Sequence, residues 1–333
     1  MLIEDAGIPP GTFGNIRFLD SGFKGSRVYS AIDGGRVVAV KIIDLDSSVD
    51  ELAEAEREVL ILSSLRHAHV TRLMRSFVNG HFLLIVQNLY SSLSLYRLLE
   101  GGFPDGLPEL AVAFVIGDCL IGLTYLHKCG LVHRALSAAH LLCDDKGRIS
   151  ITGMRHSIAI AQGLSHDFPS QHALHNLPWL APEILAQDLR GYGRPSDIYS
   201  LGILALELAN GKAPFAGLEA EKVLLYKLRD IVPSLNASKC FREPFTDFTD
   251  RCLQYEPENR PTCIDLARHV YLKQVKKYSS LWRFIHPPKD IKSIQEAKQS
   301  PMKHTAEGDR ATLRDGNSLS NDIHWSWEDS DKS

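Results

Sequence analysis

This chain of 333 residues lacks paired cysteines, an excess of basic charge and long apolar runs. Its six cysteines are scattered without a C-x-x-C pair, which argues against zinc and favours reduced thiols in the cytosol or nucleus. The net charge of −3 makes nucleic acid an unfavourable partner. The N-terminus, MLIEDAGIPPG, has neither the basic nor the apolar region of a signal peptide. We find no run of about 18 apolar residues and therefore expect no membrane-spanning segment.

The composition is otherwise that of a globular protein, with 44% hydrophobic and 23% charged residues, until the C-terminal end. After about residue 285 the chain is polar and poor in aliphatic residues, which predicts a disordered or extended tail, although Trp325 and Trp327 stand in it. We therefore divide the chain into an N-terminal extension (1–11), one globular domain (12–286) and a tail (287–333).

Short strands and one helix are predicted in the first part of the domain. Residues 34–45 and 81–89 are β-rich apolar runs, the first of which follows a Gly-Gly turn. Residues 50–67 have helical spacing, with apolar side chains predicted on one side at Leu52, Val59, Leu62 and Leu65.

Helices dominate the second part of the domain. Residues 108–130 begin with Pro108 near the first helical position and end at Gly130, which predicts a well-bounded helix. Residues 196–211 are almost entirely apolar, as in a core helix. The sequence thus predicts an α+β fold with a small strand-rich N-lobe (12–87) and a larger helical C-lobe (88–286), which is the arrangement of a protein kinase.

The stretch HRALSAAH, residues 133–140, has the frame of a kinase catalytic loop, whose usual pattern is H-R-D-L-K-P-E-N. His133 and Arg134 are kept. Ala135 replaces the aspartate that accepts the proton of a substrate hydroxyl, and a methyl group cannot do so. His140 replaces the asparagine that binds metal. Because imidazole prefers softer metals than magnesium, we expect His140 to be structural.

The metal-binding aspartate of a kinase should follow the segment GRISIT, but the next residues are Gly153, Met154 and Arg155. No carboxylate is present there, and Arg155 brings a positive charge to the place where Mg²⁺ would bind. The D-F-P triplet at Asp167 lies 14 residues too late, so we reject it as a metal site. The sequence predicts that no metal is bound.

The nucleotide-binding positions are partly preserved. The V-A-V-K segment supplies Ala39 and Lys41, and Glu58 has the spacing expected of a helix glutamate that pairs with this lysine. Val86 is predicted to border an adenine pocket, with the backbone of Gln87 and Leu89 at the hinge.

The loop that should close over the phosphates is altered. If Val28 is the valine that follows this loop, the three glycine positions hold Ser21, Phe23 and Ser26. Gly22 is a glycine of this stretch, but it stands one residue away from the expected position, as Gly25 also does. We expect a loop that covers a nucleotide poorly.

Residues that hold a kinase C-lobe together are present: Glu183 in LAPEIL, Asp197 in SDIYSLG and Arg260 in ENRPT. We predict that Glu183 and Arg260 form a buried ion pair, whose disruption costs roughly 3–5 kcal/mol. Scaffold motifs therefore survive, while the base and both metal ligands are lost together. Losing the positioning and charge stabilisation of phosphoryl transfer should lower its rate by many powers of ten.

Over about residues 12–285 the chain resembles the STE20-related adaptor (STRAD) pseudokinases. The resemblance is carried by the segments GLVHRALSAAHLL, ITGMR, DFPSQHALHNLPWLAPEILAQDLRGY, SDIYSLGILALELANGKAPF and FTDFTDRCLQYEPENRPT. The Gly-hydrophobic-Arg triplet and the HDFP segment followed by LPWLAPE are its most specific parts.

The resemblance implies a catalytically inactive adaptor with two protein partners. One is a helical-repeat scaffold of the MO-twenty-five (calcium-binding protein thirty-nine) type. The other is a serine/threonine kinase of the liver kinase B type, which the adaptor activates allosterically and keeps in the cytoplasm, with the nucleus as a second location. ATP binding without metal is also implied, with Lys41 and Arg155 as the matching positive groups. Family members end in a Trp-Glu-Phe tripeptide that docks on the scaffold; here Trp327, Glu328 and Asp329 stand near the end.

Two other functions stay open from the residues. A divergent, weakly active STE20-like serine/threonine kinase would rest on Lys41, Glu58 and the His133-Arg134 pair, and would need a substitute metal ligand. Asp144 and Asp145 are the nearest acids, but we expect both in the turn of CDDKGR. A pure interaction module would not use a nucleotide pocket, and ATP would not raise its melting temperature.

Overall fold

The computed structural model describes residues 7–21, 26–46, 49–90, 94–160, 163–168 and 175–286. By its contacts the chain forms one compact unit from Met1 to Lys298, and a second, Gln299–Ser333, lies outside the described residues. The boundaries predicted at residues 12 and 286 stay predictions. Ile8, which falls in the predicted N-terminal extension, is buried against the N-lobe sheet.

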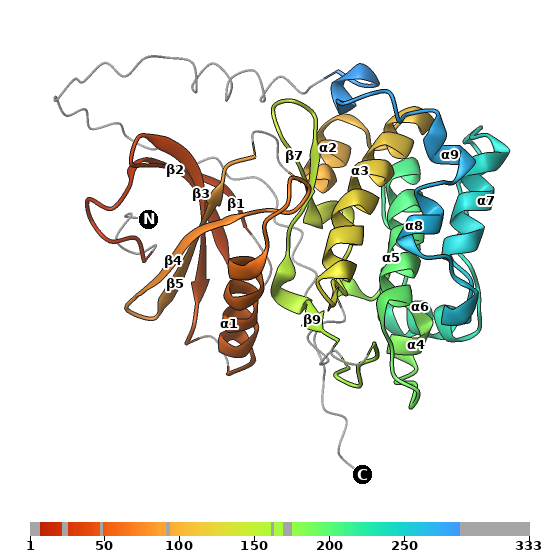
Figure 1. Cartoon of the computed structure of the whole chain (residues 1–333), viewed down its shortest axis with the longest axis horizontal. Helices are drawn as coiled ribbons and strands as arrows, with labels where there is room; N and C mark the ends of the chain where they lie inside the picture. Colours follow the sequence, from red (N-terminus) through yellow and green to blue (C-terminus); the bar gives the residue numbers. More distant parts are fainter. Residues whose placement is uncertain are drawn as a thin grey trace, which may run out of the picture. The chain divides into compact units, whose positions relative to one another are not determined.

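The N-lobe is one antiparallel sheet of five strands in the order β1-β2-β3-β5-β4, with a helix between β3 and β4 (Figure 1). Gly34 and Gly35 both have positive φ, which permits the tight turn that joins β2 to β3. The elements are β1 (Gly14–Ser21), β2 (Arg27–Asp33), β3 (Arg36–Asp44), α1 (Val49–Ser64), β4 (Leu73–Asn79) and β5 (Phe82–Asn88).

The register between β3 and β5 decides which side chains reach the C-lobe side of the sheet. Ala39 lies opposite Gln87, and Val40 lies opposite Val86. Residues opposite one another in an antiparallel pair share a face, and neighbours along a strand alternate. Lys41 therefore shares a face with Ala39 and Gln87, while Val40 and Val86 belong to the hydrophobic cluster on the other face.

Most of the apolar face predicted for helix α1 is buried: Leu62 and Leu65 are in the core and Val59 packs against it. The inner face of the helix runs through Ala55, Glu58 and Leu62, all nearly inaccessible. Leu52, predicted on this face, is 49% exposed, so that prediction is wrong. At 100° per residue Leu52 lies about 80° around the helix from Leu62, outside the buried stripe.

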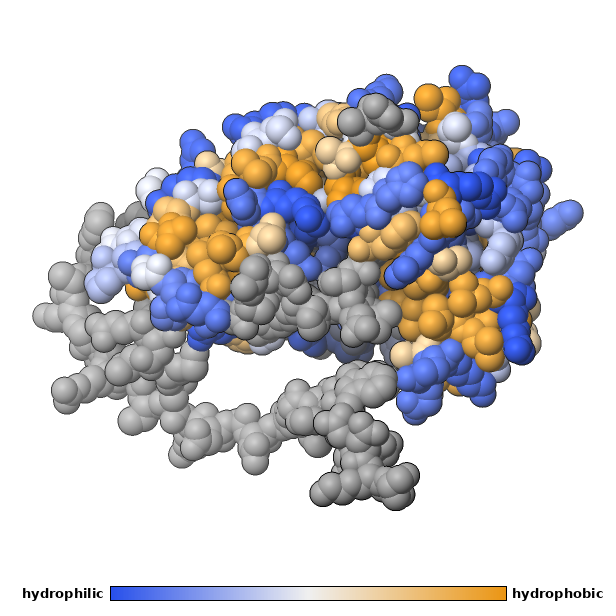
Figure 2. All heavy atoms as spheres, turned by 90° about the horizontal axis from the view of Figure 1, so that it is seen from below, coloured by the Kyte–Doolittle hydropathy of each residue, from blue (hydrophilic) through white to orange (hydrophobic). Residues whose placement is uncertain are grey.

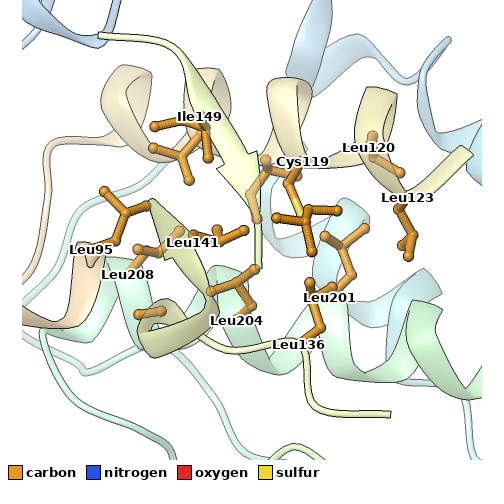
Figure 3. Close-up of a cluster of buried hydrophobic side chains, with 14 of the residues drawn as sticks. Leu95, Cys119, Leu120, Leu123, Leu136, Leu141, Ile149, Leu201, Leu204 and Leu208 are labelled. Carbon is orange, nitrogen blue, oxygen red and sulfur yellow. The ribbon is translucent and has the colours of Figure 1, made fainter. Parts of the chain in front are cut away.

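The C-lobe is built around two long helices, α3 (Glu109–Lys128) and α5 (Arg194–Asn210). Side chains from both helices and from the small β7–β8 sheet point toward one another in the core (Figure 3). The other α-helices and strands of the described residues are α2 (Leu95–Gly102), β6 (Leu131–Val132), β7 (Leu141–Cys143), β8 (Ile149–Ile151), β9 (Ile158–Ala159), α4 (Pro182–Leu185), α6 (Ala220–Leu228), α7 (Glu243–Cys252), α8 (Cys263–Leu266) and α9 (Val270–Lys273). The predicted α+β fold with two lobes is confirmed.

Helix α3 corrects one statement made from the sequence. It is long and apolar enough to cross a membrane by length and composition, with a mean hydropathy of 1.8, so an apolar run of that length does exist. In the structure 67% of that window is buried in the protein, as in the core helix of a folded domain. Pro108 precedes the helix as its N-cap. Helix α5 ends at Asn210, and Gly211, whose left-handed conformation suits a C-terminal cap, follows it.

Several apolar side chains lie at the surface on and around α6. Figure 2 views the molecule from below the orientation of Figure 1 and shows hydrophobic side chains gathered on the C-lobe. The exposed apolar residues of this segment form what we name the α6 patch, and each is between 37% and 46% exposed: Leu218, Leu225, Leu228, Ile231 and Val232. Apolar side chains gathered on one surface are a feature of protein-binding sites, whereas single exposed ones are common on any protein.

Candidate functional site

A cavity of about 490 Å³ lies between the N-lobe sheet and the C-lobe. The predicted site residues that line it are Val28, Ala39, Lys41, Glu58, Gln87, Leu89, His140, Gly153 and Arg155. Gly22 lies outside the described residues, as do Trp327 and Glu328 of the predicted docking segment. The structure therefore brings together most of the predicted nucleotide positions and two of the positions predicted to have lost catalytic groups, His140 and Gly153.

The hinge differs from its prediction by one residue. Val86 does not line the cavity, because its side chain belongs to the cluster on the far face of the sheet. Gln87 lies on the cavity face opposite Ala39, and its Nε2 is buried without a hydrogen-bond partner. The strand register, which the sequence did not reveal, makes Gln87 the side chain that borders the inner end of the cavity.

Lys41 and Glu58 form an ion pair between β3 and α1. The Lys41 Nζ lies 3.0 Å from Oε1 and 2.7 Å from Oε2 of Glu58. Glu58 is almost completely buried. The pair thus holds α1 against the sheet in the position that an active kinase requires.

Arg155 makes a second ion pair with the same helix. Its Nε donates to Oε2 of Glu54 at 2.6 Å. Glu54 precedes Glu58 by four residues, so both carboxylates lie on one face of α1. Sequence reasoning missed Glu54, although this i, i+4 spacing of acids was a usable signal. The C-lobe thus contacts α1 through Arg155, two residues after Gly153.

Residues 140 and 153, the two positions at which the sequence predicts lost metal ligands, pack directly on each other. Gly153 has a φ of +82°, and a Cβ built there would lie 2.3 Å from Cδ2 of His140. The His140 ring is held by its Nδ1, which lies 2.5 Å from the carbonyl oxygen of Ala135. Burial, together with the charge of His133, lowers the pKa of His140 to about 3, so its ring is neutral at pH 7. A side chain at residue 153 would collide with this ring.

Asp197 holds the backbone at the start of the catalytic loop. Its carboxylate accepts hydrogen bonds from the backbone N–H groups of His133 and Arg134 at 2.9 and 3.0 Å. His127 Nε2 lies 2.9 Å from the same carboxylate. Burial alone would raise the pKa of Asp197, but the hydrogen bond and charge of His127 and the charge of His133 hold it below its usual value. Asp197 is therefore an ionised anchor of the loop.

Arg134 joins the catalytic loop to the segment that follows it. Its Nη1 donates to the carbonyl oxygen of Asp167 at 2.7 Å and to the Tyr192 hydroxyl at 2.8 Å, and its Nε donates to the carbonyl oxygen of His156. The side chain of Asp167 is 58% exposed and does not line the cavity. Asp167, the acid of the D-F-P triplet, thus lies outside the cavity, in agreement with its rejection as a metal ligand.

Asp144, one of the two acids considered as a substitute ligand, is engaged elsewhere. It accepts hydrogen bonds from the backbone of Lys146 and Arg148 and pairs with the Arg148 guanidinium at 2.8 Å, in the turn between β7 and β8. It does not line the cavity. Within the part of the chain that the structure describes, no group of three or more His, Cys, Asp or Glu side chains is placed to hold a metal ion.

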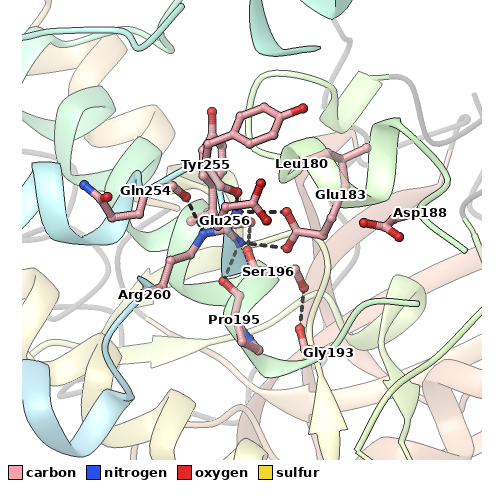
Figure 4. A network of polar contacts seen from close by, with 12 residues as sticks. Leu180, Glu183, Asp188, Gly193, Pro195, Ser196, Gln254, Tyr255, Glu256 and Arg260 are labelled. Carbon is pink, nitrogen blue, oxygen red and sulfur yellow. Dashed lines mark hydrogen bonds and ion pairs between the residues drawn. The ribbon is translucent and has the colours of Figure 1, made fainter. Parts of the chain in front are cut away.

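Glu183 and Arg260 form the buried ion pair predicted from the sequence (Figure 4). Two guanidinium nitrogens donate to the two carboxylate oxygens at 2.7 and 2.8 Å. The other three N–H groups of Arg260 donate to the backbone oxygens of Gln254, Tyr255 and Pro195. Because all five donors have partners, the pair is structural and is not available for catalysis.

Comparison with known proteins places these features in one class. Residues 17–272 match the family model of the protein kinase domain, which covers most of the chain. STE20-related kinase adapter protein alpha of Rattus norvegicus is 31% identical over 312 residues, which span 78% of this chain and 79% of that protein. STE20-related kinase adapter protein beta of Mus musculus is 32% identical over 295 residues, spanning 74% and 70%. Within the protein kinase superfamily, the chain belongs to the STE20-related kinase adapter family.

Proposed function

We propose that this chain is a catalytically inactive pseudokinase adaptor. In this proposal it binds a serine/threonine kinase of the liver kinase B type, activates it allosterically and holds it in the cytoplasm. It acts together with a helical-repeat scaffold of the MO-twenty-five type. The observation that carries the inactivity is the contact between His140 and Gly153, since a neutral ring fills the space where a metal-binding carboxylate would extend.

The shape of an active kinase is nevertheless maintained, which supports an adaptor role. The Lys41–Glu58 pair holds α1, and Asp197 anchors the catalytic loop, although Ala135 cannot accept a proton. A partner would therefore meet an ordered, closed surface. The α6 patch supplies apolar area for such a contact.

Nucleotide binding is the second part of the proposal. The cavity between the lobes is lined by Lys41 and Arg155, and we propose that it binds ATP without a metal ion. A ligand present at 100 times its dissociation constant should stabilise the fold by about 2.7 kcal/mol. Melting curves with ATP, in EDTA and in Mg²⁺, test this part. An equal rise in both is expected, whereas a rise that requires Mg²⁺ would favour the weakly active kinase.

The adaptor role is tested by reconstitution. The full chain, the scaffold and the partner kinase are mixed, and transfer of phosphate from ATP to a peptide substrate is measured. We expect the chain to raise the partner's activity. A parallel reaction with a catalytically dead partner must show no transfer, because any phosphate transferred there would come from this chain. No activation in the complete mixture, or Mg²⁺-dependent transfer by this chain alone, would contradict the proposal.

Docking of the C-terminal segment on the scaffold is the third part. We propose that Trp327, with Glu328, anchors this contact, because one buried aromatic side chain can dominate a small interface. The Trp325→Ala variant is a matched control two residues away. Affinity for the scaffold, measured with the full chain, should fall in Trp327→Ala and stay near the original value in Trp325→Ala. Equal affinities in both variants would contradict this docking role.

A further inference from the structure

The last segment of the C-lobe that the structure describes, residues 268–286, is strongly basic. It contains five lysines and arginines and neither aspartate nor glutamate, although the chain as a whole has a net charge of −3. All five basic side chains are exposed, and we name them the α9 cations: Arg268, Lys273, Lys276, Lys277 and Arg283. Asp265, the acid that precedes the segment, is engaged with Thr262 in the capping box of α8. The segment therefore presents charge of one sign.

Two carboxylates on the helices that pack against α9 are already paired with other side chains. Helix α9 packs against α3 and α7. Glu109 of α3 pairs with Arg242, while Asp247 of α7 pairs with Arg251 and His269. Within the described part of the chain, none of the α9 cations forms an ion pair. Their charge is thus available to a ligand from outside the chain.

The segment has a buried face and an exposed face. Its buried side chains belong to the C-lobe core: Tyr271, Leu272, Val275, Leu281 and Ile285. Val270, Lys273 and Lys277 are spaced by three and four residues, which places side chains together on one side of a helical turn. Val270 is 55% exposed and Tyr278 is 37% exposed. The Lys277 Nζ lies 5.2 Å from the centre of the Tyr278 ring, so cations and apolar groups share the exposed face.

This combination fits the headgroup layer of an anionic membrane better than it fits another polyanion. Clusters of about four to eight lysines and arginines on an amphipathic segment are typical of proteins that bind anionic lipids. Three of the α9 cations are lysines, whose compact charge on a flexible stem adapts to headgroups without fixed positions. Tyrosine and apolar side chains are favoured at the boundary between headgroups and acyl chains, whereas the backbone of a nucleic acid would give Val270 no apolar contact.

We propose that the α9 cations, together with Val270 and Tyr278, form a peripheral binding surface for membranes that contain anionic phospholipids. The contact would be made from outside the bilayer, without a spanning segment. In Figure 1, α9 lies at the upper end of the C-lobe and α6 at its lower end, so a bound membrane would leave the α6 patch accessible to a protein partner. The adaptor would then be able to place a bound partner at a membrane surface.

The test is sedimentation of the full chain with lipid vesicles. One set of vesicles consists of phosphatidylcholine with about 30% phosphatidylserine, and the other of phosphatidylcholine alone. We expect binding to the anionic vesicles at about 0.1 M salt, a large loss of binding at about 0.5 M salt, and no binding to the neutral vesicles. Equal binding to both sets, or binding to neither, would overturn the proposal.

Two triple variants locate the binding surface. Each lysine near an anionic membrane contributes about a fivefold factor in affinity, so Lys273→Gln, Lys276→Gln and Lys277→Gln together should weaken binding about a hundredfold. The matched control combines Arg17→Gln, Arg36→Gln and Arg72→Gln, which remove the same charge from exposed positions of the N-lobe. It should change the affinity by less than about twofold. An equal loss in both variants would show that binding follows net charge rather than this surface, and would overturn the proposal.

A second polyanion separates the membrane from a protein partner. The same chain is titrated with polyglutamate, whose charge is carried by a peptide. Binding to polyglutamate without binding to the anionic vesicles would assign the α9 cations to an acidic protein and overturn the proposal. The α9 cations belong neither to the cavity between the lobes nor to the α6 patch, so this inference stands or fails independently of the proposed function.

Discussion

The contact between His140 and Gly153 predicts that the two altered metal positions are energetically coupled. In Gly153→Asp the new Cβ would lie 2.3 Å from Cδ2 and 2.8 Å from Cγ of His140, and overpacking of this kind costs about 1–3 kcal/mol. The φ of +82° adds left-handed strain of about 1–2 kcal/mol. We therefore expect Gly153→Asp alone to destabilise the fold by about 2–5 kcal/mol.

His140→Asn removes the ring that causes the collision. By itself it should cost about 1–3 kcal/mol, through lost packing and a weakened hydrogen bond to Ala135. In the double variant the collision is absent and only the backbone strain remains. The free energies of unfolding, measured in urea at pH 7, should therefore show a favourable coupling of about 1–3 kcal/mol between the two substitutions.

Gly80→Asp is the control for backbone strain without crowding. Gly80 has a φ of +59°, and a Cβ built there would meet no atom within 4 Å. Combined with His140→Asn it should be additive within about 0.5 kcal/mol. If the free-energy changes of Gly153→Asp and His140→Asn are also additive within that limit, the His140 ring does not require a glycine at residue 153. Our reasoning about this contact is then refuted.

Three further predictions concern stability, pH and partner binding. Arg260→Leu should lower the free energy of unfolding by about 3–5 kcal/mol, because it leaves the buried carboxylate of Glu183 unpaired; adding Glu183→Leu should recover part of this loss in the same urea titration. Burial raises the pKa of Glu207 from 4.5 to about 7, so this carboxyl group binds its proton more tightly in the folded protein than in the unfolded chain. The free energy of unfolding should therefore fall by about 3 kcal/mol between pH 4.5 and pH 7. Glu207→Gln should remove that fall, and equal pH profiles of the two proteins would show that another group causes it. Leu228→Glu in the α6 patch should reduce activation of the partner kinase, whereas Ile264→Glu, at a similarly exposed apolar position on α8, should not; equal activation by both would exclude the patch as the contact.

The spacing of residues in the sequence was sufficient to predict part of the site, but it did not predict the tertiary contacts of the site. The lysine of the V-A-V-K strand and the glutamate of the following helix could be paired from the sequence, because their motifs have a nearly fixed order in a kinase. The positions of Val86 and Gln87 could not, because a one-residue change of strand register exchanges the two faces of a sheet. The pairing of Arg155 with Glu54 joins residues 101 apart in sequence, and no local pattern encodes it.

The altered residues of the catalytic loop also explain why the frame around them is kept. In an active kinase the carboxylates of the base aspartate and of the metal-binding aspartate repel each other until a cation binds, so they reduce the stability of the empty site. Here Ala135 is buried without any polar group to satisfy, and His140 is a neutral ring that bonds to the backbone of the same loop. The two carboxylates on α1 that face the cavity side are meanwhile paired with Lys41 and Arg155. A closed arrangement of this helix therefore needs neither metal nor phosphate, which is the property that an adaptor requires if it is to present a kinase-shaped surface continuously to a partner.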